Sequence, residues 1–247
     1  MPQVFIGTSG FSYSHWREGV FYPKGLSVSE QLQYYSRYLK TVELNNTFYR
    51  LPSSKTFQHW YVQTPANFTF AVKVSRFITH IKKLSQCDLA WKKFFSRSVL
   101  LKNKLGPFLF QFPPTWHEDA RRLESFLAML KRFDSNRQYR YVFEFRHSSW
   151  FCQKIYALLK KYKISLCVAD SDKFPLEKKI TTEFVYVRMH GRVNLYNSNY
   201  SHYQLKNLAK QIKQWLKLDL DVYVYFNNDA FGYAVENARY LNQFFAS

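Results

Sequence analysis

Residues 108–146 read FLFQFPPTWHEDARRLESFLAMLKRFDSNRQYRYVFEFR, and this stretch contains one complete repeat of the pattern that decides the fold. It begins with the apolar run 108–112 and ends with the β-rich run 139–145. Between the two runs, apolar residues recur every three or four positions, as on the buried face of a helix. They are Ala120, Leu123, Phe126, Leu127 and Leu130. A strand, a helix and a second strand in this order predict two parallel strands joined by a helical crossover.

The same unit recurs along the whole chain. Eight strand candidates alternate with helical patterns, which predicts parallel strands with right-handed crossovers. The candidates are Val4–Thr8, Thr41–Asn45, Phe68–Val74, Phe108–Phe112, Tyr139–Phe145, Ile164–Asp170, Phe184–Met189 and Asp221–Phe226. A chain of 247 residues fits one barrel of about 250 residues. No GxGxxG or GxxxxGK[ST] loop supports an open nucleotide-binding sheet. We therefore expect an α/β fold, a single (β/α)8 TIM-type barrel domain over residues 1–247.

Three helix starts carry the spacing of a capping box, in which a hydroxyl residue is followed three positions later by Glu or Gln. The three pairs are Ser27 with Glu30, Thr115 with Glu118, and Ser201 with Gln204. Each stands before an apolar stripe. The sixth unit is the weakest, because residues 171–183 leave room for only a short helix.

The chain is strongly basic, with 36 Lys and Arg against 17 Asp and Glu and a formal charge of +19. Such an excess often indicates a polyanionic partner. Many of these cations, however, lie at solvent-facing positions of expected helices. They are Lys92, Lys93, Arg121, Arg122, Lys131, Arg132, Lys206, Lys210, Lys213 and Lys217. A solvated basic exterior is therefore the favoured interpretation, and a nucleic-acid partner is the less favoured alternative.

Nothing in the sequence indicates a membrane or a secretory pathway. No apolar run reaches the roughly 18 residues that a membrane span needs. The N-terminal residues do not have the pattern of a signal peptide. The three cysteines, Cys87, Cys152 and Cys167, are widely spaced and odd in number, which fits a reducing compartment. We expect a cytoplasmic protein without a membrane partner.

Polar residues close nearly every expected strand. In a barrel, alternate residues point inward, and those near the strand C-termini reach the active-site face. The residues selected in this way are Glu43, Asn45, Lys73, Gln111, Glu144, Arg146, Asp170, Arg188, His190 and Asn227. Unpaired charges inside a barrel would cost several kcal/mol each. The charges must therefore pair with one another or with a ligand, and a buried ion network that only closes the barrel top remains the alternative.

Further candidates stand in the loops after strands one, two, three and five, on the same expected face. These are Tyr13, His15, Trp16, Tyr49, His80, His147 and Trp150, and Tyr196 follows strand seven. They would wall the pocket or stack on a ligand, with simple loop packing as the alternative. The sequence names no cofactor. A metal bound by Glu43, Glu144, Asp170 and His190 is a weak alternative, because Lys73, Arg146 and Arg188 would repel a divalent cation.

Several stretches together resemble the DUF72 family, also called YecE-like proteins. They are IGTSGFSYSHWREGVFYP, TVELNNTFYRLPS, FAVKVSRFITH, GPFLFQFPP, EFRHSSW, CVADS, VYVRMHGR and VYVYFNND, in this order from about Phe5 to Phe244. The resemblance implies a TIM barrel and supplies no reaction, because the activity of the family is unassigned. Its motif residues largely coincide with the inward-facing set, and they add Thr8, Ser9, Tyr13, Trp16, Tyr49, His80, His147, Trp150 and Gly191.

The leading hypothesis is an enzyme that uses acid–base chemistry on a small anionic substrate bearing a phosphate or carboxylate. The candidate catalytic residues are Glu43, Glu144, Asp170 and His190. The candidate substrate-binding residues are Thr8, Tyr13, Trp16, Asn45, Tyr49, Lys73, His80, Gln111, Arg146, His147, Trp150, Arg188 and Asn227. Arg188 is expected to be the main anion anchor, helped by His190 and Asn227, because an arginine can grip an anion with two parallel bonds. The alternatives are a nucleic-acid-processing or nucleic-acid-binding barrel and a non-catalytic binding protein.

Overall fold

The computed structural model describes residues 1–192, 195–196 and 198–245. Its strands form one sheet in which every neighbouring pair is parallel. The strands are β1 Val4–Ser9, β2 Thr41–Leu44, β3 Thr69–Lys73, β4 Leu105–Gln111, β5 Tyr141–Glu144, β6 Ser165–Leu166, β7 Val168–Ser171, β8 Phe184–Gly191 and β9 Asp221–Phe226. They follow the order β6-β5-β4-β3-β2-β1-β9-β8-β7.

The two ends of this order belong to one stretch of chain. β6 pairs with β5, β7 pairs with β8, and only Cys167 separates β6 from β7. The Ser165 hydroxyl also donates to the Phe184 carbonyl oxygen, 3.2 Å away, which links β6 to the start of β8. The eight expected strands are therefore present, the sixth is interrupted at the point where its partner changes, and the predicted barrel is confirmed.

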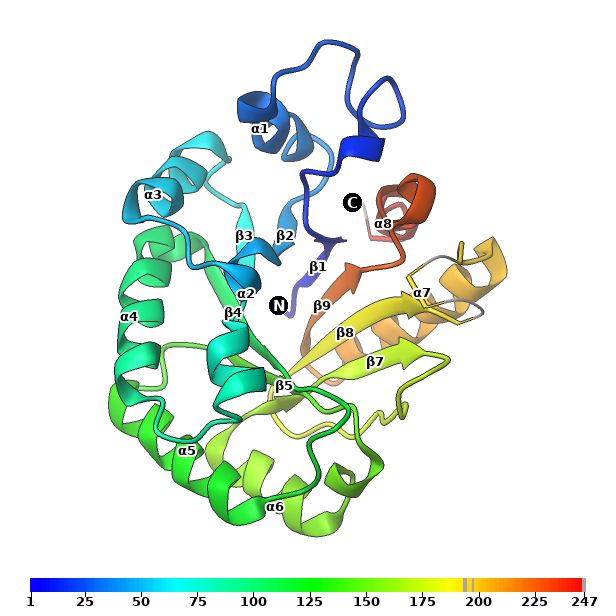
Figure 1. The fold of residues 1–247 in the computed structure, drawn as a ribbon. Helices are drawn as coiled ribbons and strands as arrows, with labels where there is room; N and C mark the ends of the chain where they lie inside the picture. Colours follow the sequence, from blue (N-terminus) through cyan, green and yellow to red (C-terminus); the bar gives the residue numbers. More distant parts are fainter. Residues whose placement is uncertain (193–194, 197, 246–247) are drawn as a thin grey trace.

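Helices surround the barrel, with α3 to α6 along one side of its exterior (Figure 1). The α-helices are α1 Gln31–Tyr35, α2 Asn46–Tyr49, α3 Ser54–Gln63, α4 Asp88–Ser98, α5 Ala120–Phe133, α6 Gln153–Tyr162, α7 His202–Lys217 and α8 Tyr233–Asn242. Short 3-10 helices lie at Ser14–Trp16, Val28–Glu30, Val99–Lys104, Ser148–Trp150 and Ala230–Gly232, and a π-helix lies at Phe77–Ile81. Residues 172–183, all described, contain no helix, so the sixth unit lacks even the short helix for which it has room.

Two of the three expected capping boxes are present, at Ser27 with Glu30 and at Ser201 with Gln204. The third was predicted at Thr115 and Glu118 and is wrong. Helix α5 begins later, at Ala120, where the Asp119 carboxylate accepts a hydrogen bond from the backbone N–H of Arg122. Aspartate is as strong an N-cap as serine or threonine, so this residue decides where the helix starts.

Alternate strand residues divide the apolar side chains into two cores. The larger core lies between the strands and the helices. The smaller core fills the barrel interior with Phe5, Ala71, Leu109, Val142, Cys167, Phe184, Tyr186, Tyr223 and Tyr225. The inner positions beyond these residues, toward the strand C-termini, are polar. The barrel is thus a packed core with a polar layer at one end.

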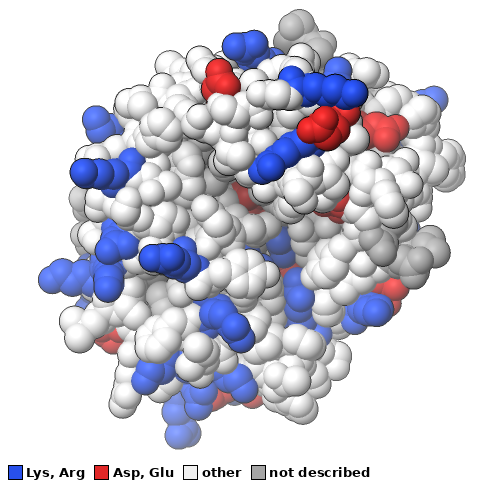
Figure 2. Space-filling model, turned by 45° about the horizontal axis from the view of Figure 1, so that its top comes forward, with Lys and Arg blue, Asp and Glu red and all other residues white. Residues whose placement is uncertain are grey.

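The helix cations selected from the sequence lie on the molecular surface. All are exposed except Arg122, which is partly buried and pairs with Asp119 through Nε and Oδ2 at 3.1 Å. On the face in Figure 2, Lys and Arg lie in several groups that uncharged side chains separate, with Asp and Glu interspersed. Among the described residues, no helix combines the length and apolar character that a membrane span requires.

Candidate functional site

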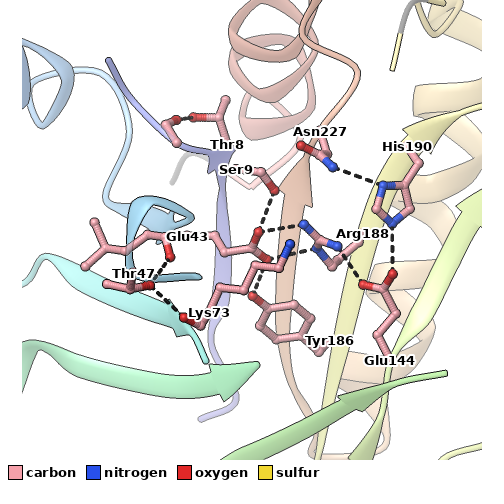
Figure 3. Close-up of polar contacts among 12 residues, drawn as sticks. Thr8, Ser9, Glu43, Thr47, Lys73, Glu144, Tyr186, Arg188, His190 and Asn227 are labelled. Carbon is pink, nitrogen blue, oxygen red and sulfur yellow. Dashed lines mark hydrogen bonds and ion pairs between the residues drawn. The ribbon is translucent and has the colours of Figure 1, made fainter. Parts of the chain in front are cut away.

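Arg188 lies at the centre of the polar layer and joins two carboxylates from opposite sides of the barrel (Figure 3). It donates from Nε to Glu43 Oε2 at 3.0 Å and from Nη2 to Glu43 Oε1 at 2.8 Å. Its Nη1 donates to Glu144 Oε2 at 2.6 Å. Arg188 is 1% exposed and both carboxylates are fully buried. Such charge-assisted, partly bidentate contacts are the ones that can offset the cost of burying charge.

Both carboxylates also accept hydrogen bonds from other side chains. Ser9 and Tyr186 donate their hydroxyls to Glu43 at 2.8 and 2.7 Å. Arg146 donates from Nε to Glu144 Oε1 at 2.8 Å. Glu43, Glu144, Arg146 and Arg188 form what we call the charged network, in which two carboxylates balance two guanidinium groups.

The charged network holds its carboxylates ionised. Burial alone would raise the pKa of Glu43, but the charge and hydrogen bonds of Arg188 outweigh it, so the pKa lies below the ordinary value. Burial opposes ionisation of Glu144 as well, yet Arg188 and Arg146 hold its pKa well below the usual range. Neither group is a proton donor near pH 7.

His190 lies behind the charged network and is fully buried. Its Nδ1 is 3.1 Å from the Asn227 amide nitrogen, and its Nε2 is 3.5 Å from Glu144 Oε1. Burial lowers the pKa of His190 to about 4, in spite of the nearby Glu144 carboxylate. The ring is therefore neutral at pH 7, and the long Nε2 contact is not an ion pair.

Lys73 differs from the other buried charges because it has no partner. It ends β3 and is 9% exposed. Its Nζ lies 4.1 Å from the centre of the Phe48 ring. This nitrogen makes no hydrogen bond or ion pair with any other residue that the structure describes. Its carbonyl oxygen accepts a 2.6 Å hydrogen bond from Thr47 on α2, which holds the strand end in place. Burial, followed by the positive charge of Arg188, lowers the pKa of Lys73 to about 7.

A pocket of about 680 Å³ opens above this layer at the strand C-termini. Its walls come from the loops after β1, β2, β8 and β9, and Lys73 and Arg146 contribute cationic side chains. The lining residues are Gly10, Phe11, Ser12, Tyr13, His15, Leu44, Asn45, Asn46, Tyr49, Lys73, Arg146, Arg188, Tyr196, Asn227, Asp229 and Ala230. The volume is that of a small-molecule site.

Asp229 lines the pocket, and hydrogen bonds to Trp16 and His15 fix its carboxylate. Its Oδ1 accepts from Trp16 Nε1 at 2.8 Å, and its Oδ2 lies 2.9 Å from His15 Nε2. Burial raises the pKa of Asp229 to about 6, although the bonds from Trp16 and His15 oppose that rise. A carboxyl group that titrates near neutral pH therefore faces the same pocket as Lys73.

Asp170 lies apart from the charged network, which corrects its expected place in the site. Both of its oxygens are bound by Arg192, at 2.7 to 2.9 Å, and Oδ1 also accepts from Tyr200 at 3.0 Å. Along β7 it shares parity with Val168, which packs in the outer core, whereas Cys167 lies in the inner one. The strand ends in a register shift just after Asp170. Period two thus places Asp170 on the helix-facing side.

The expectation that Arg188 is the main anion anchor also needs correction. Three of its N–H donors are taken by Glu43 and Glu144, and almost none of its surface is exposed. Arg188 contributes to the pocket floor, but its main partners are the two carboxylates. Arg146 has its guanidinium over the Phe174 ring at 4.1 Å and is more accessible.

Several other predicted site residues do not line the pocket. Thr8 faces α1, where its hydroxyl lies 2.9 Å from the Tyr35 hydroxyl, because it shares parity with the outward Ile6. Trp16 lies behind Asp229. Trp150 stacks on Phe145, with ring centres 4.3 Å apart, and donates to the Trp116 carbonyl oxygen.

Three more predicted residues lie near the site without lining the pocket. Gln111 is buried and donates to the carbonyl oxygen of Phe112. His80 packs edge-on against Phe48, with ring centres 4.9 Å apart, and burial lowers its pKa to about 4. His147 stacks on His117, with ring centres 3.8 Å apart, and its side chain caps the short helix after β5. Tyr13, Asn45, Tyr49 and Asn227 do line the pocket.

The sequence analysis does not select three residues that the site uses, Phe48, Tyr186 and Asp229, and it names Ser9 only through the family resemblance. Strand parity could have found Ser9 and Tyr186, since Ser9 has the parity of the inward Phe5 and Tyr186 that of Arg188. Phe48 lies in the one-turn helix α2 and Asp229 in the loop after β9, and neither segment is long enough for a repeat that would show where its side chains point. In the described part of the chain, no cluster of three or more His, Cys, Asp or Glu side chains could hold a metal ion.

Comparison with known protein families gives a match that extends over residues 5–247. The matching family model is described as protein of unknown function DUF72. Among curated proteins, the chain is 27% identical over 269 residues to UPF0759 protein YunF from Bacillus subtilis strain 168. That alignment covers 96% of this chain and 93% of the relative.

Solved structures show the same similarity. A DUF72 family protein from Thermotoga maritima MSB8 superposes with a TM-score of 0.85 at 31% identity, covering 98% of this chain and 99% of that one. A DUF72 family protein from Enterococcus faecalis V583 gives a TM-score of 0.81 at 22% identity, covering 98% and 95%. The second similarity concerns the fold alone.

Proposed function

This chain belongs to the DUF72 family, and from the geometry of its pocket we propose that the protein binds a small organic anion and acts on it by acid–base chemistry. The expected substrate carries a carboxylate or a phosphate. The proposal keeps the general class of function that the sequence favours and changes the residues that would perform it.

The observation that carries the proposal is the unpartnered Lys73 at the floor of the pocket. The charged network is neutral by itself, because two guanidinium groups balance two carboxylates. A protonated Lys73 therefore adds a positive charge that no described carboxylate contacts, on the floor of a partly enclosed site that Arg146 also lines. An anion is the ligand that would pair with this charge.

Acid–base chemistry is supported by the two groups that titrate near neutral pH. Lys73 has a pKa of about 7 and Asp229 one of about 6, and both line the pocket. Groups with a pKa near the working pH exchange protons most effectively. Glu43 and Glu144, in contrast, stay ionised, and His190 is enclosed. We therefore assign Glu43 and Glu144 to holding and neutralising the two arginines, and Lys73 and Asp229 to proton transfer.

The test is anion-induced thermal stabilisation. We expect phosphate, sulfate or a small carboxylate to raise the melting temperature of the wild-type protein in proportion to occupancy. Arg146→Gln keeps a donor for Glu144 but removes the charge, so its anion-induced shift should fall by half or more. Lys131→Met, an exposed substitution on α5, is the matched control and should behave as the wild type. Equal anion-induced shifts in all three proteins would rule out an anion site at Arg146.

A further inference from the structure

We propose that Lys73 is a nucleophile that forms a covalent imine with a small carbonyl compound bearing a carboxylate or phosphate. This inference rests on the proposed function, because it uses the same pocket, and it names the substrate class. The reactive group would be an aldehyde or ketone carbon close to the anionic group.

A comparison within the chain shows what is unusual about Lys73. Lys104 is buried to a similar extent, and its Nζ donates to the carbonyl oxygens of Tyr61 and Thr64 at 2.6 Å each. Its third contact is the Thr64 hydroxyl at 3.2 Å. Lys104 therefore has the partners that a structural, charged lysine needs. Lys73 has only the face of Phe48 beneath it and opens to the pocket instead.

The surroundings of Lys73 favour the free amine over the ammonium ion. Burial removes water from the charge, and Arg188 and Arg146 repel it. Glu43 and Glu144 oppose this effect only partly, since both are already paired with arginines. With a pKa of about 7, roughly half of Lys73 is free amine at neutral pH, whereas an ordinary lysine with a pKa of about 10.4 is almost entirely protonated. A desolvated lysine next to other cations is a recurrent way to activate an amine.

The reaction balances without a further reactant. The Nζ lone pair attacks the carbonyl carbon, a C–N bond forms, and the carbonyl oxygen takes up a proton. Nitrogen then loses a proton, the hydroxyl oxygen gains a second proton, and the C–O bond breaks as water leaves. Starting from the free amine, the sum takes up one proton and gives a protonated imine and one water molecule, and no atom changes oxidation state overall.

The pocket contains groups suited to these steps. Asp229 titrates near neutral pH and can supply and recover the proton at the oxygen. Arg146 can hold the carboxylate or phosphate of the substrate through its free N–H groups. The iminium product carries the same single positive charge as the lysine ammonium, so the charge balance of the site is kept.

The experiment is reductive trapping. Wild-type protein is incubated at pH 7 with pyruvate and sodium cyanoborohydride, which reduces an imine to a stable secondary amine, and the adduct is located by peptide mass spectrometry. We expect one dominant adduct at Lys73, formed at least about tenfold faster than at the average surface lysine, because far more of Lys73 is free amine. Its rate should rise with pH and level off above about 7.

Two variants and one second probe complete the test. Lys73→Arg keeps the positive charge and should lose the dominant adduct, while Lys104→Arg should keep it. Acetone has the carbonyl but no anionic group, so it should label Lys73 more slowly than pyruvate does. Labelling spread evenly over surface lysines, or an unchanged pattern in Lys73→Arg, would overturn the inference.

The two proposals can fail separately. Anion-induced stabilisation without a Lys73 adduct would leave the anion site and remove the imine. A Lys73 adduct formed equally well from acetone and pyruvate, with no stabilisation by anions, would leave a reactive lysine and remove the anion site.

Discussion

At the residue scale, the central feature is that the buried cations Arg188 and Lys73 have different partners. Arg188 is held by two carboxylates, whereas Lys73 has an aromatic face and a pocket. A guanidinium group can satisfy several acceptors at once and stays charged, while an ammonium group shifts its pKa readily when it is buried. The arginine therefore suits a structural role and the lysine a chemical one.

Arg188→Met should strongly destabilise the protein. The substitution leaves Glu43 and Glu144 buried without their main partner, and removing one member of a buried ion pair costs about 3–5 kcal/mol. Arg188→Lys keeps the charge and should lose less. The measurement is the free energy of unfolding in urea. A loss under about 1 kcal/mol for Arg188→Met would show that the charged network does not support the fold.

Lys73 should give the protein a stability that rises with pH. Its pKa is about 7 in the folded chain and about 10.4 when unfolded, so between these values the unfolded chain binds one more proton. The free energy of unfolding should then increase by up to about 1.4 kcal/mol per pH unit. This contribution is complete above the unfolded pKa and is lost as pH falls through about 7.

Lys73→Met removes this proton and should flatten the curve. Urea unfolding at pH 7, 8 and 9 compares the wild type, Lys73→Met and the exposed control Lys131→Met. Parallel curves for all three proteins would contradict a lowered pKa at Lys73.

At the element scale, local signals determine where helices begin but not which way loops turn. Ser201 opens α7 with a capping box, in which its hydroxyl accepts from the Gln204 N–H at 3.3 Å and the Gln204 side chain accepts from the Ser201 N–H at 2.8 Å. At α5, Asp119 replaces the expected cap at Thr115. The sixth strand divides at Cys167, where the chain changes partners to close the barrel.

Ser201→Ala should lower the free energy of unfolding by about 1 kcal/mol, the usual value of an N-cap side chain. Ser201→Asp keeps an acceptor for the same N–H and should stay close to the wild type. Thermal or urea unfolding measures both. A loss of the same size in the two variants would mean that something other than the cap stabilises this helix start.

At the scale of the whole molecule, most of the charge lies on an exterior rich in cations, whereas the charged network in the interior is neutral. The formal charge is +19, yet the charged network is neutral. The helix cations point to solvent on several sides of the barrel, and on the face in Figure 2 they form separate groups. Polyanion binding depends on many cations that contact one phosphate backbone together. This distribution does not favour such a groove.

We therefore expect no retention of single-stranded DNA or RNA at about 0.15 M salt, and a salt slope near zero. Binding is measured by fluorescence anisotropy at several salt concentrations. A variant with Lys206, Lys210 and Lys213 changed to Gln tests the most regular row of cations, on α7. Tight binding that weakens steeply with salt would instead support the nucleic-acid alternative.

Some of the residues that the sequence selects for the C-terminal end of the barrel do lie together there in the structure, and others do not. Period two along the strands was sufficient for Glu43, Lys73, Glu144 and Arg188, because in a barrel the direction of a strand side chain follows from its parity. The same period would also have excluded Asp170, because Asp170 has the opposite parity to Cys167, which faces the barrel interior. Loop residues such as His147 and Trp150 could not be placed in this way, since a turn has no fixed repeat.

The sequence by itself determined the α/β barrel, the order of its units and most of its inward polar positions, because alternation in strands and spacing in helices are local properties of the chain. Only the tertiary structure decided which buried charged side chains pair with each other. Arg188 reaches Glu43 and Glu144 from strands far apart in sequence, and this leaves Lys73 unpaired. Such pairing depends on distances across the barrel, which arise only when the sheet closes and no local pattern encodes them.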